Sequence, residues 1–342
     1  MKYRYFVLTF AILFAISSFY CSSKNDDKSS SENKKSGNEL VRKSGDNIFV
    51  TLKMIPKIGE VHNYKMLISQ SASQVSDYTN NKEISSRQDI EYYYSLNASE
   101  INSDGVITYK VKYDSIKVYY SENNPDNPFE FRYNSNIKDS IYKMQDFATY
   151  NAIIGNEFKI RVSPLSEVKE VIEMDKIESV IEKEFGDTLK TTEKNQIMDA
   201  LKNQMKEVIQ SQFQKFKDKE LSKDSTWTFT EESTIGNFPV QNIMTYKITD
   251  IQQQDKITKV TISSNLDFKV LENVLKDKQA TMSLEDENGT GSGTIIFNVS
   301  SGIVEKKTYD KSFSSKIKLS GGGKSIKMTR KDSINFNIEL LK

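Results

Sequence analysis

Apolar and polar residues alternate over most of the chain beyond about residue 48, a pattern typical of strands with one buried face. The apolar positions are rich in β-branched and aromatic residues, which favour an extended backbone. Short connections separate most of these segments, so we expect antiparallel meanders rather than crossover units. The predicted strands are 48–55, 61–69, 90–98, 106–120 and 158–162 in the first half, and 226–231, 244–251, 257–268, 280–284, 294–299, 303–319 and 325–340 in the second.

Glycine residues mark the turns of the second half. Asn288-Gly289, Gly291 and Gly293 lie between the strands predicted at 280–284 and 294–299. Glycine and asparagine are the residues that tight turns prefer, because they tolerate a left-handed backbone. We therefore predict a turn in this stretch.

Between the two β regions, the apolar spacing changes to three and four residues, which predicts helices. A short amphipathic helix is expected to begin near Asp175 and to end at Gly186 as its C-terminal cap. A longer helix of about seven turns follows, and we expect its apolar stripe to pack against the sheet, with a membrane-lying helix as the alternative. That stripe consists of Ile197, Leu201, Met205, Val208, Ile209, Phe213 and Phe216.

The two β regions echo each other in sequence. The stretch that begins with Tyr94-Ser95-Leu96 resembles the one that begins with Tyr246-Lys247-Ile248, and 158–164 resembles 295–301. We therefore predict an α+β, mostly β fold of two antiparallel curved sheets, related by an internal duplication and joined by a central helical segment. Coincidental strand alternation is the alternative explanation of the echo. The predicted division is a signal peptide at 1–20, a lipidated cysteine and disordered tether at 21–47, an N-terminal β half at 48–174, a helical segment at 175–221 and a C-terminal β half at 222–342.

The N-terminus has the pattern of an export signal. Lys2 and Arg4 precede an apolar run at 6–16, and Cys21 follows soon after. The run is shorter than the ~20 residues that a transmembrane helix needs. Cleavage of the signal is therefore favoured over a retained anchor.

Cys21 is the only cysteine of the chain. A cysteine directly after the apolar run and before a polar segment resembles the lipobox of bacterial lipoproteins, in which this cysteine is acylated and becomes the mature N-terminus. The chain departs from that pattern at Tyr20, where a small residue is usual. The resemblance implies lipidation of Cys21 and a membrane anchor, which we expect in the outer membrane on its periplasmic or surface face. An incidental thiol in an ordinary secretory signal is the alternative.

Charge and composition narrow the functional classes. Lys and Arg number 48 against 47 Asp and Glu, so no global field attracts nucleic acid. The single cysteine and the single histidine, His62, leave few of the groups used in nucleophilic catalysis or in metal sites. We therefore expect a non-enzymatic protein with no cofactor, no metal and no catalytic residue. His62 is expected to be a hydrogen-bonded or surface residue.

The order of motifs also resembles an uncharacterised family of secreted bacterial lipoproteins. These motifs are Ile58-Gly59-Glu60, a Gly-x-x-Phe-x-Ile-x-Val-Ser stretch at 155–163, and a strand start at Asp224-Ser225-Thr226-Trp227. The family has no established activity, so the resemblance implies no catalytic residue. Trp227 is expected to anchor the core.

Three functional hypotheses follow. The first is an envelope lipoprotein that binds a hydrophobic ligand or lipid between sheet and helix. The alternative is a structural or assembly lipoprotein that contacts other envelope proteins, in an oligomeric state left open. A carboxylate-based hydrolase is a remote third, since the acidic neighbours Glu231-Glu232, 285–287 and Asp26-Asp27 would point to opposite faces of a strand.

Overall fold

The computed structural model describes residues 40–185, 191–276 and 280–342. The export signal predicted at 1–20, Cys21, Asp26-Asp27 and the cap predicted at Gly186 lie outside these ranges. The tether predicted at 21–47 extends too far, because strand β1 (Val41–Ser44) forms a hairpin with β2 (Asn47–Thr51). Val50 of β2 is fully buried, which ties this hairpin to the core.

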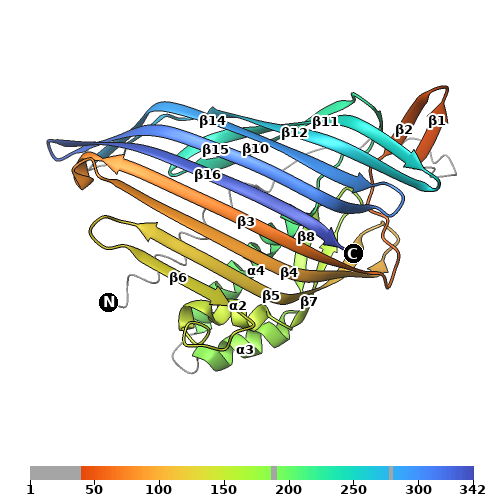
Figure 1. The fold of residues 1–342 in the computed structure, drawn as a ribbon, viewed down its shortest axis with the longest axis horizontal. Helices are drawn as coiled ribbons and strands as arrows, with labels where there is room; N and C mark the ends of the chain where they lie inside the picture. The colour runs from red at the N-terminus through yellow and green to blue at the C-terminus, as the bar shows by residue number, and fades with distance from the viewer. Residues whose placement is uncertain (1–39, 186–190, 277–279) are drawn as a thin grey trace.

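Thirteen strands of the described chain form one large antiparallel sheet, which twists strongly from one end to the other (Figure 1). β13 (Val274–Lys276) also pairs with β14, and β6 (Phe129–Asn134) with β5. The main order is β10 (Thr226–Ile235), β11 (Phe238–Gln254), β12 (Ile257–Val270), β14 (Ala280–Asn298), β15 (Ile303–Gly321), β16 (Lys324–Leu341), β3 (Val61–Ser76), β4 (Glu83–Ile101), β5 (Ile107–Asn123), β7 (Glu157–Val162) and β8 (Val168–Ile172).

The mostly β, antiparallel character of the prediction is confirmed, but the two halves share one sheet instead of forming two. The last strand, β16, pairs with the first long strand, β3, from Met328 opposite Ser76 to Leu341 opposite Asn63. This pairing joins residues about 250 to 280 positions apart, and local alternation carries no information about such partners. The internal duplication stays a prediction.

A second, small sheet consists of β1, β2 and β9 (Glu220–Ser222). Arg42 on β1 donates to Glu220 from Nε at 2.9 Å and from Nη2 at 2.6 Å. Both side chains are nearly half exposed, so we expect this pair to orient the strands more than to stabilise them.

Three α-helices lie within the described residues: α2 (Ala148–Ile153), α3 (Asp175–Phe185) and α4 (Thr191–Gln212). The buried positions of α4 include Leu201, Met205 and Val208, and they share one core with sheet residues. The predicted packing of an apolar stripe against the sheet is thus what the structure has. We call the sheet face that α4 covers the inner face. Figure 1 views the sheet from its other face, with α4 behind the strands. α4 is shorter than predicted, since Phe213 and Phe216 lie beyond its end and are still buried.

The turn predicted at Gly289, Gly291 and Gly293 does not form. All three glycines lie inside β14, which runs unbroken from Ala280 to Asn298 and pairs with β15 along its length. Their role is therefore to leave space on the sheet face, which the next subsection describes.

Candidate functional site

The C-terminal end of α4 is fixed to the inner face by buried polar side chains. Gln210 accepts from the Val168 backbone N–H at 2.6 Å, and Gln212 accepts from the Tyr94 hydroxyl at 2.5 Å. Lys307 of β15 donates to the carbonyls of Ser211 at 3.0 Å and Phe213 at 3.4 Å. A cation at this position complements both the unpaired carbonyls and the dipole of the helix end.

Beside this helix end lies a pocket of about 80 Å³. Its walls are the inner face from β10 to β3 and the segment that follows α4. Most of the lining surface is apolar, and half of the lining residues are apolar or aromatic: Ile68, Phe213, Phe229, Met244, Tyr246, Leu266, Ile295, Tyr309 and Phe336. We name this cavity the inner pocket.

The glycines of β14 make room for aromatic rings beside the inner pocket. A Cβ on Gly289 would lie 1.8 Å from the ring of Phe268, and one on Gly291 would lie 2.5 Å from the Tyr309 hydroxyl. Real side chains do not approach so closely, so only glycine lets these rings lie across β14. The Tyr309 ring thus lies directly over the β14 backbone at Gly291, and the β14 side chain that lines the pocket is that of Ile295.

Two lysines face the inner pocket from the same strand. Lys307 and Lys311 are each only 8% exposed, and they alternate with Tyr309 on the inward side of β15. Burial lowers the pKa of Lys307 to about 7, and the contacts with the two carbonyls do not offset this. Burial also lowers the pKa of Lys311, while the nearby Asp332 carboxylate acts in the opposite direction. The pocket therefore combines an apolar lining with buried amino groups.

Two contacts tie the segment after α4 to β10. The Lys215 ammonium lies 2.9 Å from a Glu231 carboxylate oxygen, and both side chains are less than one-fifth exposed. The Lys217 ammonium lies 4.6 Å from the centre of the Phe229 ring. These contacts close one side of the inner pocket.

Polar and aromatic groups on β10 and β11 complete the surroundings. Trp227 is buried, as the sequence predicted, and its ring stacks on Tyr246 at 5.4 Å. Asn242 is 7% exposed, and its Nδ2 donates to Ser233 at 2.7 Å. Within the described ranges its Oδ1 has no hydrogen-bond partner, so the pocket offers one acceptor to a ligand.

The other residues singled out by the sequence do not converge on a site. His62 lies on β3, with Nε2 3.5 Å from Glu60. Glu231 pairs with Lys215 whereas its neighbour Glu232 is exposed, as expected for adjacent strand positions. Asp286 pairs at the surface with Lys316 at 2.9 Å. In the part of the chain that the structure describes, no group of three or more His, Cys, Asp or Glu residues could hold a metal ion.

Sequence reasoning missed Lys307 and Lys311. The sequence did contain a sign of them. Both lysines lie an even number of residues from Tyr309 and Phe313 on the same strand, so all four side chains point to the buried face. A lysine at an inward-facing position is unusual, so this spacing would have identified both as candidate site residues.

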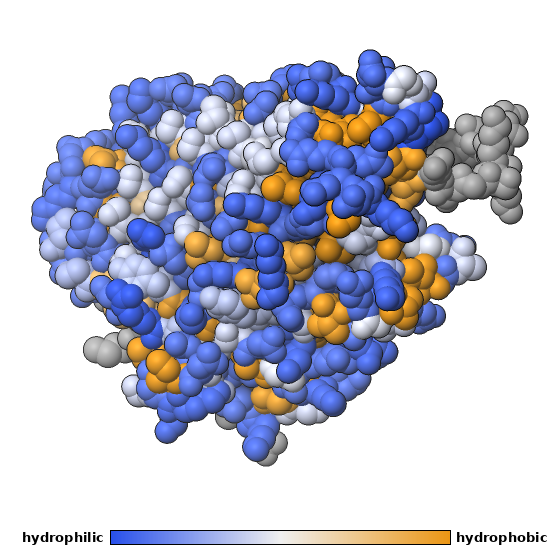
Figure 2. Space-filling view, turned by 45° about the vertical axis from the view of Figure 1, so that its right-hand side comes forward, coloured by the Kyte–Doolittle hydropathy of each residue, from blue (hydrophilic) through white to orange (hydrophobic). Residues whose placement is uncertain are grey.

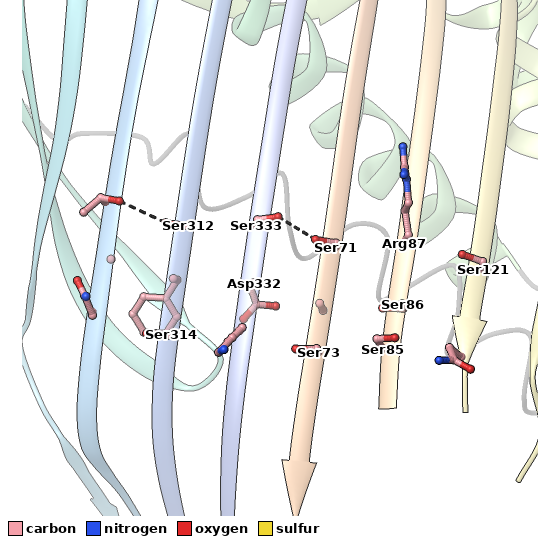
Figure 3. Close-up of a pocket in the computed structure, with 17 residues that line it drawn as sticks. Ser71, Ser73, Ser85, Ser86, Arg87, Ser121, Ser312, Ser314, Asp332 and Ser333 are labelled. Carbon is pink, nitrogen blue, oxygen red and sulfur yellow. Dashed lines mark hydrogen bonds between the residues drawn. The ribbon is translucent and has the colours of Figure 1, made fainter. Parts of the chain in front are cut away.

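The opposite, outer face of the sheet carries a larger but plainer groove of about 550 Å³ (Figure 3). Small hydroxyl side chains cross it from strand to strand: Ser333 and Ser71 are 2.8 Å apart, and Thr290 and Ser312 3.2 Å. Although the outer groove is larger, we regard the inner pocket as the candidate site. The groove is open and lined with small polar groups, whereas the inner pocket has the apolar lining and few placed polar groups typical of ligand sites.

A membrane-spanning helix is not found in the described part of the chain, where no helix is both long and apolar enough.

Comparison with known proteins places the chain in a family without assigning a function. No curated protein matches its sequence. The solved structure of lipovitellin, reported for its lipid–protein interactions, has 10% identity and a TM-score of 0.39, and the match covers 84% of this chain and 25% of lipovitellin. The chain thus spans about a quarter of the length of that protein.

Pseudomonas aeruginosa OccK7 (OpdD) has 6% identity and a TM-score of 0.21, with 83% of this chain and 100% of OccK7 covered. P. aeruginosa OpdK with vanillate has 7% identity and a TM-score of 0.18, with 81% and 98% covered. At these TM-scores the likenesses do not extend to function. Residues 104–304, more than half of the chain, match the family of unknown function DUF6263, so the chain belongs to that family.

Proposed function

We propose that the protein is a non-enzymatic, exported lipoprotein that binds a hydrophobic ligand in the inner pocket. The observation that carries the proposal is the apolar and aromatic lining of this pocket beside the end of α4. Its volume of about 80 Å³ is below the roughly 300–1,000 Å³ of pockets that enclose drug-sized ligands. We therefore expect a thin ligand, a single hydrocarbon chain, with part of its length outside the pocket as it stands.

A neutral fluorescent probe, N-phenyl-1-naphthylamine, tests the proposal on purified protein. Its fluorescence should rise saturably with the wild type. Leu266→Trp fills the pocket, because Leu266 is 5% exposed in its lining, and should abolish the rise. Leu341→Trp, at a position that is 38% exposed, is the matched control and should behave as the wild type does. Thermal unfolding of both variants separates pocket filling from loss of fold. A wild type without saturable binding contradicts the proposal.

The anchor and the location belong to the same proposal. The lone Cys21 after the apolar run at 6–16 supports lipidation, and lipidation supports placement at the outer membrane. Cys21→Ala should move the protein from the membrane fraction to the soluble fraction of its host. Unchanged membrane association would exclude the lipid anchor.

A second candidate function is assembly with other envelope proteins. Large apolar residues are exposed at the sheet end where β3 begins: Ile58 is 49% exposed, Val61 52% and Ile101 42%. The Gly59 N–H donates to the Ala98 carbonyl at 2.8 Å, which holds Ile58 beside the end of β4. Apolar residues are visible among hydrophilic ones on the surface in Figure 2, in which this end of the molecule comes forward. Exposed apolar patches of this kind mark interaction surfaces.

A photo-crosslinker at Val61 tests this second function in intact cells. The control position is Ser312, which lies on the outer face away from that end. Crosslinks to another envelope protein from Val61 and none from Ser312 would favour assembly. Monomer alone from both positions would remove it.

A further inference from the structure

The charged groups that line the inner pocket are engaged within the protein. The Lys215 ammonium pairs with the Glu231 carboxylate at 2.9 Å, and the Lys307 ammonium donates to the two carbonyls at the end of α4. Lys311 has the carboxylate of Asp332 nearby. A charged ligand would have to compete with these contacts, and breaking a buried pair is costly. The electrostatics of the lining therefore favour a neutral ligand.

One neutral polar side chain of the lining lacks a complete set of partners. Among the residues that the structure describes, Asn242 is the only one in the lining with a buried side-chain oxygen or nitrogen that has no hydrogen-bond partner. That atom is Oδ1, an acceptor, whereas Nδ2 donates to Ser233 Oγ at 2.7 Å. Asn242 is only 7% exposed. An unpaired acceptor at such a position costs free energy, which a donor from a ligand recovers.

Strand geometry places Asn242 at one end of the apolar lining on β11. Its side chain has the same inward direction as those of Met244 and Tyr246, which lie two and four residues further along and line the same pocket. A strand rises about 3.4 Å per residue, so the path from Asn242 to Tyr246 is on the order of 14 Å. Trp227 stacks on Tyr246 at the far end. A ligand with its polar head at Asn242 can therefore place a single hydrocarbon chain along β11 towards Trp227.

The neighbours of Asn242 restrict the head group. Its register partners are Glu231 on β10 and Phe268 on β12. A ligand carboxylate at this position would bring further acceptors and a negative charge towards Oδ1 of Asn242 and the carboxylate of Glu231. An ether or an ester has acceptors alone. A hydroxyl or an amide N–H is neutral and supplies the missing donor.

We infer that the ligand is a neutral long-chain amphiphile, an alcohol or an amide, whose O–H or N–H group donates a hydrogen bond to Oδ1 of Asn242. This inference rests on the proposed function, because it names the ligand class for the same pocket. The apolar contacts contribute affinity, and the donated hydrogen bond gives selectivity. A buried acceptor discriminates against an analogue without the donor, because that analogue leaves the acceptor unpaired.

Displacement of bound N-phenyl-1-naphthylamine by 1-decanol and by its methyl ether, 1-methoxydecane, tests the inference. The two compounds share the hydrocarbon chain and differ in the donor. 1-Decanol should bind the wild type about tenfold more tightly than the ether, after correction for the affinity of the probe. Asn242→Leu, which is similar in shape and has no acceptor, should bring the two affinities within about twofold.

Two controls accompany this experiment. Gln241→Leu changes the neighbouring residue, whose side chain lies on the other face of the sheet, and should keep the full preference for the alcohol. Decanoate, titrated at pH 8 where its carboxyl group is ionised, should bind the wild type no more tightly than 1-decanol does. This second control tests the neutrality of the ligand.

The outcomes separate the inference from the function on which it rests. Equal affinities for the alcohol and the ether in the wild type, or a preference that persists in Asn242→Leu, overturn the inference while the apolar site stands. Tighter binding of decanoate than of 1-decanol overturns it as well. Failure of the probe itself to bind the wild type overturns both. Probe binding by Asn242→Leu shows that this variant still has a formed pocket, so its loss of preference cannot come from unfolding.

Discussion

The two halves of the inner face have the same alternation of inward and outward residues, but one half is tightly packed and the other contains a pocket. In the N-terminal half, large rings fill the space: Tyr94 stacks on Tyr64 at 5.7 Å, and Tyr113 lies 5.6 Å from Tyr94 and 6.2 Å from Phe158. In the C-terminal half, the corresponding inward positions of β14 are Gly289, Gly291 and Gly293, and a pocket remains. One sheet thus holds a closed core and an open site, and side-chain size decides which.

The largest expected effect comes from the closed half. Tyr113→Ala should lower the free energy of unfolding by about 3–5 kcal/mol, because the residue is 1% exposed and surrounded by rings. Tyr309→Ala should cost less, since its ring lies over Gly291 and Gly293 on one side and borders the inner pocket. Chemical denaturation of both variants checks this, and equal losses would break the comparison.

The buried lysine of the open half predicts a pH dependence. Burial lowers the pKa of Lys307 to about 7, whereas a lysine in the unfolded chain titrates near ~10.4. Between these values the unfolded chain binds more protons, so stability should rise with pH, by up to ~1.4 kcal/mol per pH unit. Below the lower value both states are protonated and the destabilising effect of burial is fully present.

Denaturation between about pH 7.5 and 9.5 measures this slope, below the unfolded tyrosine pKa of ~10. Lys307→Met should reduce it, and Lys306→Met, whose side chain is exposed, should not. Identical slopes in the wild type and Lys307→Met would show that Lys307 does not titrate in this range.

The glycine stripe gives the next effect. Gly291→Val should push the Tyr309 ring into the inner pocket, because even a Cβ would lie 2.5 Å from its hydroxyl. We expect a loss of about 1–3 kcal/mol, as in other overpacked sites, together with loss of N-phenyl-1-naphthylamine binding. Ser292→Val, on the exposed side of the same strand, is the control. Retained probe binding in Gly291→Val would mean that the glycines do not shape the pocket.

The smallest effect concerns the contact that closes the pocket. Glu231→Gln removes the partner of Lys215 in a pair less than one-fifth exposed, and a loss of about 1 kcal/mol is expected for a partly buried pair. The exposed pair of Lys316 and Asp286 is the matched reference, and Asp286→Asn should have no measurable effect on unfolding. A larger loss for Asp286→Asn would reverse this ranking.

The contrast between the halves also explains what the sequence could reveal. The strands and the stripe of α4 follow from local periodicity, so Leu201 and Met205 were placed correctly on the packed face. The single sheet could not be foreseen, because it depends on the pairing of β16 with β3, which lie far apart in the sequence. Gly291 suggested a turn by its residue type alone, since glycine serves both turns and close approaches of neighbouring rings. The site was missed for a related reason. It depends on glycines, which have no side chain, and on lysines at strand positions that face the buried side of the sheet.

The most direct measurement of the central claim uses the single tryptophan of the chain. Trp227 stacks on Tyr246, which lines the inner pocket. A terminally brominated eleven-carbon alcohol, which is uncharged and quenches an indole only on close approach, is titrated into the purified protein against the unbrominated alcohol. Binding in the inner pocket predicts saturable quenching of Trp227 by the brominated compound alone. Quenching that rises linearly without saturation, or that is equal for both alcohols, would contradict it.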